Sequence, residues 1–95
     1  MSKRDAYVEK LKAQIDEWDA ELDKLQAQAD KAAADAKIEY HKQIESLRKQ
    51  SEDARSKLAE LQQKSGEAWE QFVQGVDEAW THLKKGIDDA KSRLQ

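Results

Sequence analysis

The side chains of this sequence best suited to metal binding or proton transfer are two histidines, each with a glutamate four positions away. His41 is followed by Glu45, and Glu78 precedes His82. Four positions is about one helical turn, so each pair lies on one face of a helix. A zinc site needs three or four ligands, and a His with one Glu supplies two. We therefore predict surface ion pairs at these positions and no metal site.

Other arrangements that perform chemistry are missing from the sequence. It has no Cys, so thiolate catalysis, disulfides and cysteine-based zinc sites are excluded. The Asp and Glu residues are scattered among polar neighbours, whereas a tuned acid–base couple needs contrasting environments. No Gly-rich phosphate loop is present. We expect a protein that is not an enzyme and that carries no cofactor.

The composition predicts long helices. Ala, Glu, Lys, Leu and Arg make up 49 of the 95 residues, and Pro is absent. This bias is typical of coiled coils when the apolar residues are also periodic. The net charge of -3 is small and both signs are mixed along the chain, which argues against nucleic acid as a partner.

From Ala68 the sequence repeats every eleven residues, as AWEQFVQGVDE, AWTHLKKGIDD and AKSRLQ. Eleven residues make three helical turns, so equivalent positions stay on one face with little drift. The repeat predicts an amphipathic helix over 67–94 with a continuous apolar face. That face contains Trp69, Phe72, Val76, Trp80, Leu83 and Ile87.

Two glycines recur within this repeat, at Gly75 and Gly86. A glycine inside a helix costs about 1 kcal/mol relative to alanine. We expect close approach of a neighbouring backbone at both positions, with controlled flexibility as the alternative.

The N-terminal part has a second apolar seam, spaced alternately by three and four residues as in a heptad repeat. Ser2 with Asp5 predicts a helix N-cap before Lys3. The seam consists of Val8, Leu11, Ile15, Trp18, Leu22 and Leu25. Beyond it the spacing changes to four, four, three, and between 27 and 36 the seam is almost entirely alanine. Alanine is the best helix former, so we expect the helix to continue through this segment.

Lys64, Ser65 and Gly66 form the stop signal that we accept. Gly66 suits the left-handed conformation after a helix, and Ser65 suits the start of the next one. The predicted fold is all-α, a single unit over 1–95: a long helix over 3–64, a turn at 65–66 and a shorter helix over 67–94 that packs back antiparallel. One alternative is three helices of near-equal length with a second reversal between 27 and 36. Another is a single continuous rod.

In the preferred hairpin the short helix covers only half of the long one, which leaves the seam from Val8 to Leu25 exposed. Such an apolar stripe predicts self-association. The contact surface would combine both apolar sets: Val8, Leu11, Ile15, Trp18, Leu22, Leu25, Trp69, Phe72, Val76, Trp80, Leu83 and Ile87.

Three stretches resemble small bacterial coiled-coil proteins that are labelled stress-response proteins and were first noted in cyanobacteria. They are SKRDAYVEKLKAQIDEWDAELDKL, ADKAAADAKIEYHKQIESLRKQ and LAELQQKSGEAWEQFVQGVDEAWTHLK, in which DEW, DAKIEY and SGEAW are the most recognisable strings. The resemblance covers nearly the whole chain. It implies a soluble bacterial cytoplasmic protein with a stress-linked role, and it implies no catalytic residues and no cofactor.

The sequence therefore predicts a non-enzymatic coiled-coil module that acts structurally or binds protein, as a homo-oligomer or with another protein. The alternative is reversible binding to a membrane surface through the eleven-residue repeat. Charge argues against that alternative, because residues 67–95 carry six acids against four bases. The N-terminus lacks the apolar core of a secretory signal, so we expect a cytoplasmic protein.

Overall fold

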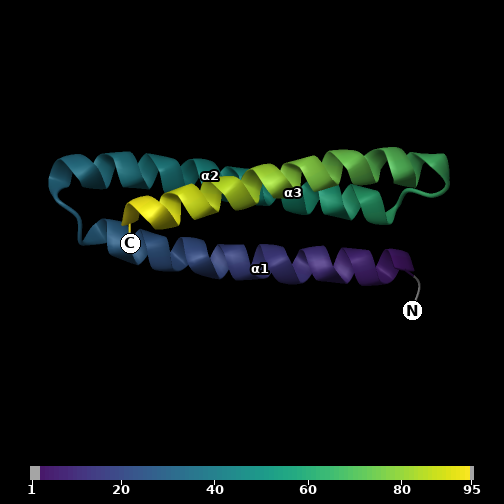
Figure 1. Cartoon of the computed structure of the whole chain (residues 1–95), viewed down its shortest axis with the longest axis horizontal. Helices are drawn as coiled ribbons and strands as arrows, with labels where there is room; N and C mark the ends of the chain where they lie inside the picture. Colours follow the sequence, from purple (N-terminus) through teal and green to yellow (C-terminus); the bar gives the residue numbers. More distant parts are fainter. Residues whose placement is uncertain (1–2, 95) are drawn as a thin grey trace.

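The computed structural model describes residues 3–94, which form three helices arranged up, down and up (Figure 1). Helix α1 spans Lys3–Asp30, α2 spans Ala34–Gln62 and α3 spans Glu67–Leu94. The helices have 28, 29 and 28 residues, and the Cα trace measures 51 × 21 × 17 Å. The all-α prediction is confirmed. The cap expected at Ser2 lies outside the described residues.

The predicted long helix over 3–64 is wrong, because the chain reverses at Lys31–Ala33 as in the three-helix alternative. The backbone N–H groups of Lys31 and Ala32 donate to the carbonyls of Gln28 and Ala29, both at 3.1 Å. Ala33 is extended, with φ −61° and ψ 153°, and α2 begins after it. The physical reason is burial: a straight helix would leave the leucines of α1 in water, whereas the reversal covers them at the cost of a few helical hydrogen bonds.

The second reversal lies where the sequence predicts it, between α2 and α3. Gly66 has φ 60°, the left-handed conformation that glycine adopts without strain. The carbonyl of Gly66 accepts the first bond of α3, from the N–H of Trp69 at 3.2 Å. The observed α3 agrees with the predicted helix over 67–94, while α2 ends two residues before the predicted Lys64.

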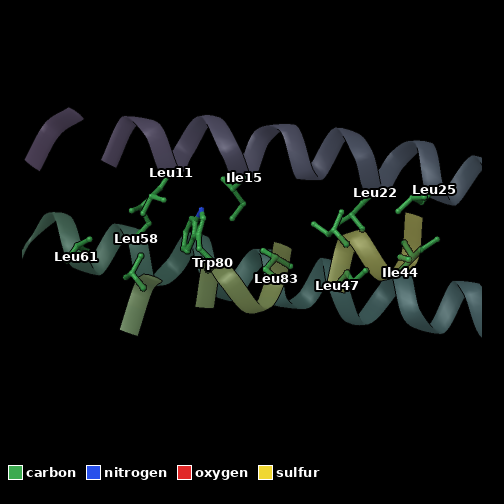
Figure 2. Packing of buried hydrophobic residues seen from close by; sticks show 14 of the residues in the cluster. Leu11, Ile15, Leu22, Leu25, Ile44, Leu47, Leu58, Leu61, Trp80 and Leu83 are labelled. Atoms are coloured by element: carbon green, nitrogen blue, oxygen red, sulfur yellow. The ribbon is translucent and has the colours of Figure 1, made fainter. Parts of the chain in front are cut away.

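The core runs along the axis between the three helices, and all of them contribute to it (Figure 2). Leu22 and Leu25 of α1, Leu61 of α2 and Leu83 of α3 are at most 1% exposed. Full burial of such a side chain contributes about 1.5–3 kcal/mol. The buried apolar residues are Val8, Leu11, Ile15, Leu22, Leu25, Ala29, Ile44, Leu47, Ala54, Leu58, Leu61, Val76, Trp80, Leu83, Ile87 and Ala90.

A row of polar contacts connects α1 and α2. The guanidinium Nη2 of Arg55 lies 2.5 Å from Asp16 Oδ1 and 2.7 Å from Asp19 Oδ2, and these hydrogen bonds raise the pKa of Arg55, that to Asp16 most. The hydroxyl of Ser51, a buried polar side chain, donates to Asp19 Oδ1 at 2.7 Å. Because Ser51 is buried, a shift of register that removed its acceptor would be penalised, whereas the exposed pairs of Arg55 contribute little.

Candidate functional site

Most residues of the predicted contact surface lie inside the chain's own core, which corrects the prediction that the α1 seam is exposed. Nine of the twelve are buried, and Trp18, Trp69 and Phe72 are half-buried. Sequence reasoning grouped these residues correctly as apolar faces that meet other helices. It assigned the partner to another molecule, whereas in this structure the partner is the same chain.

Four partly buried apolar residues lie at the end of the bundle where α1 and α3 both begin (Figure 1), whereas Ile38, a large apolar residue that is 59% exposed, lies near the start of α2. We call Tyr7, Trp69, Phe72 and Val73 the aromatic end; all four are half-buried and pack against the core. The rings of Tyr7 and Trp69 meet edge to face, with centroids 6.1 Å apart and planes at 71°. Phe72 and Val73 follow Trp69 by three and four residues and so lie on the same side of α3.

Two cations cover faces of the aromatic end. The guanidinium carbon of Arg4 lies 4.8 Å from the ring centroid of Trp69, and the ammonium of Lys64 lies 5.4 Å from that of Phe72. Both distances are within the range of cation–π attraction. The cations come from the first turn of α1 and from the α2–α3 turn, so three segments meet here.

Tyr7 also ties α1 to α3 through its hydroxyl, which donates a hydrogen bond to Asp77 Oδ1. Burial raises the pKa of the Tyr7 phenol, and the hydrogen bond to Asp77 and its negative charge raise it further. The phenol is therefore a neutral donor here. It orients one edge of the aromatic end and has no arrangement for proton transfer.

An open groove of about 410 Å³ runs between α2 and α3 beside Gly75. It is lined by Gln50, Asp53, Ala54, Lys57, Gly75, Glu78, Ala79 and His82. The lining includes both acidic and basic side chains, so no single class of ligand is favoured.

The two glycines of the repeat have different surroundings, and the predicted backbone approach is found at neither. A Cβ at Gly86 would meet Leu47 Cδ2 at 2.7 Å, so this glycine makes room for a side chain of α2. A Cβ at Gly75 would meet nothing within 4 Å. Only Gly86 has a packing reason.

The predicted ion pairs of His41 with Glu45 and of His82 with Glu78 are not formed within residues 3–94. His41 Nε2 lies 2.9 Å from Asp30 Oδ1, across the α1–α2 turn, and His82 lines the groove. Within residues 3–94 no three His, Asp or Glu side chains are placed to hold a metal ion.

Sequence reasoning missed Tyr7, Arg4 and Lys64 because it searched for one seam per helix. The available signal was a second edge on α1: the half-buried residues Tyr7, Gln14, Trp18 and Glu21 are spaced seven, four and three apart. That edge faces α3. The ring centroids of Trp18 and Trp80 are 6.4 Å apart, and Oε2 of Glu21 lies 3.7 Å from Nζ of Lys91.

No family model, curated protein or solved structure matches this chain in the comparisons with known proteins. The described helices also include none that is long and apolar enough to cross a membrane. The fold and the aromatic end are therefore the basis of the functional argument.

Proposed function

We propose that the protein is a non-enzymatic helical module that binds another protein through the aromatic end. The observation that carries the proposal is the half-buried group Tyr7, Trp69, Phe72 and Val73, already held in place by the bundle. Trp, Tyr and Arg are the residue types most enriched among interface residues that dominate binding energy. Ordering them beforehand lowers the entropy lost on binding.

The two cations indicate the chemistry of the partner. Arg4 and Lys64 lie over ring faces that a partner would need to reach. An acidic side chain beside an apolar one would draw each cation aside by charge and then cover the ring. We expect a partner surface that combines carboxylates with an apolar residue.

The experiment compares two variants with the wild-type protein in a binding assay, using a partner isolated on the wild-type protein. Trp69→Ala together with Phe72→Ala removes the centre of the aromatic end and should weaken binding at least about tenfold. Trp18→Ala is the matched control, since Trp18 is also a half-buried tryptophan but lies in the middle of the α1–α3 contact. Equal loss in both variants, at equal helix content, would contradict the proposal.

The resemblance to stress-response coiled-coil proteins supports a stress-linked role in a bacterial cytoplasm as part of this proposal. It predicts that the amount of the protein rises under stress, which quantitative blotting of stressed and unstressed cultures measures. An unchanged amount under osmotic, oxidative, heat and nutrient stress would remove this part.

A second candidate, binding to a membrane surface, is favoured by one feature of α3. Its buried residues Val76, Trp80, Leu83, Ile87 and Ala90 all lie on one face. That face would have to leave α1 and α2 before it met lipid. Flotation with anionic vesicles at low salt tests it, and absence of bound protein would reject it.

A further inference from the structure

The apolar seam passes through the α1–α2 turn without losing its helical phase. Its spacing of four, four, three occurs twice in succession between Leu25 and Leu47, and the first of these two eleven-residue units spans the reversal. If the turn were straightened, both halves would lie on one face of one helix. When two helices are joined by a turn, the apolar residues of one can be out of helical phase with those of the other and both faces can still be buried. The residues concerned are Leu25, Ala29, Ala33, Ala36, Tyr40, Ile44 and Leu47.

The turn itself has few features that oppose straightening. Ala33 occupies the N-cap position of α2 and makes no side-chain capping hydrogen bond. No residue of Lys31–Ala33 has a positive φ, and two of the three are alanine. Helical geometry is therefore open to every residue of the turn, and alanine favours it most.

The reversal is stabilised by burial of the apolar face of α1 against α2 and α3. The α2 and α3 helices of a second copy of the chain could bury the same face. Three polar side-chain pairs follow the antiparallel register of α1 and α2: Asp16 with Arg55, Asp23 with Arg48, and Asp30 with His41. The two residue numbers add to 71 in each pair, so the register is constant along the interface. Two straight helices running antiparallel reproduce it around a twofold axis near residue 35, beside the turn.

We propose that two copies of this chain exchange α1. The turn at Lys31–Ala33 straightens, residues 3–62 become one helix, and α1 of each copy packs against α2 and α3 of the other. Every contact that α1 makes within the chain is then made between chains. This inference does not depend on a partner at the aromatic end, and either proposal can fail while the other holds.

The exchanged dimer should form slowly and depend on concentration. Leu22 and Leu25 are fully buried, so α1 must leave the core before it can exchange. Refolding from urea at millimolar concentration should yield a dimer, whereas refolding at micromolar concentration should yield the monomer. Light scattering after size exclusion should show two species that do not interconvert during the run.

Ala34→Pro is the variant that tests the turn. Ala34 is the first residue of α2, where proline fits, and Ala33 before it is already extended with ψ 153°. In a straight helix over 3–62 the same proline would be internal and would break it. The variant should keep the monomer's helix content and lower the dimerisation constant at least about a hundredfold.

Ala34→Ser is the matched control, because it changes the same residue and does not block a continuous helix. It should leave the refolded dimer unchanged. A dimer that survives Ala34→Pro, or that Ala34→Ser abolishes, would overturn the exchange of α1. Wild-type protein that stays monomeric after refolding at millimolar concentration would overturn it as well.

A crosslink between chains identifies the exchanged contacts directly. Chains that carry Asp16→Cys are refolded together with chains that carry Arg55→Cys, and a short thiol-reactive crosslinker is added. Exchange brings position 16 of one chain to position 55 of the other and should give a covalent heterodimer. A dimer that forms without this crosslink would be a side-by-side dimer and would contradict the proposal.

Discussion

The two turns of this bundle reverse the chain in different ways. The α2–α3 turn contains Gly66 at φ 60°, a conformation that penalises every other common residue. The α1–α2 turn contains Lys31, Ala32 and Ala33, and both residue types have a high helix propensity. The α2–α3 turn is therefore specified by its own glycine. The α1–α2 turn is specified by the packing of the two helices that it connects.

The difference explains why the first turn depends on distant contacts. Folding back allows Leu22 and Leu25 to become fully buried, and it pairs Asp30 with His41 across the turn. None of this gain comes from the turn residues themselves. A turn of this kind should fail when burial fails, whereas a glycine turn should fail when its glycine is replaced.

The largest expected effect comes from weakening burial beside the first turn. Leu22→Ala should lower the free energy of unfolding by about 2–5 kcal/mol, because it leaves a cavity in the core. Urea denaturation measures the change, and amide exchange in α1 should accelerate more than in α2. Lys24→Ala, on an exposed position of the same helix, should change stability by less than about 0.5 kcal/mol. Equal effects would contradict a burial-dependent first turn.

Replacing the glycine of the second turn should have the next largest effect. Gly66→Ala should cost about 1–2 kcal/mol, because the left-handed conformation strains a Cβ although no atom lies within 4 Å of it. Gly75→Ala is the matched control. It is the same substitution inside α3, where the space is also open, and it should raise stability by about 1 kcal/mol. Changes of the same sign would show that backbone conformation does not distinguish the two sites.

Adding a cap to the first turn should stabilise it. Ala33→Ser places a hydroxyl at the N-cap of α2, where it can accept an exposed backbone N–H, and should raise stability by about 1 kcal/mol. Thermal unfolding measures the gain. Ala34→Ser, one residue into the helix, should bring no gain. If both serines act alike, the first turn is not limited by its missing cap.

The smallest effect at neutral pH concerns Tyr7, whose hydroxyl joins α1 to α3 through its hydrogen bond to Asp77. Its raised pKa means that the folded state keeps the phenol proton where the unfolded state, with a pKa near 10, loses it. The stability from this group is complete below about pH 10 and is lost as pH rises further. Tyr7→Phe should therefore flatten the fall of Tm above about pH 10. Parallel curves for the variant and the wild type would contradict this role.

The sequence was informative wherever one residue type specified one conformation. Gly66 marked the second turn, and the eleven-residue repeat marked α3 with its bounds at Glu67 and Leu94. The first turn could not be found this way, since alanines between 27 and 36 signal helix continuation while the fold reverses there. Only the total burial of α1 decides between the two, and it depends on all three helices.

The candidate site shows the same limit. Trp69 and Phe72 belonged to the predicted apolar face, and they remain accessible. Tyr7 lies off the main seam of α1. Arg4 and Lys64 look like ordinary surface charges in the sequence, and only the fold shows that they lie over the rings of Trp69 and Phe72. Contacts between the start of α1 and the start of α3 follow from the first reversal, so missing that turn meant missing the aromatic end.

Small-angle X-ray scattering of the dilute protein tests the central claim, the reversal at Lys31–Ala33, most directly. The account predicts a radius of gyration close to the 15.3 Å of the Cα trace, from a particle about 51 Å long. A straight helix over residues 3–64 would be about 90 Å long, with a radius of gyration of about 26 Å. A monomer of that length would contradict the three-helix bundle.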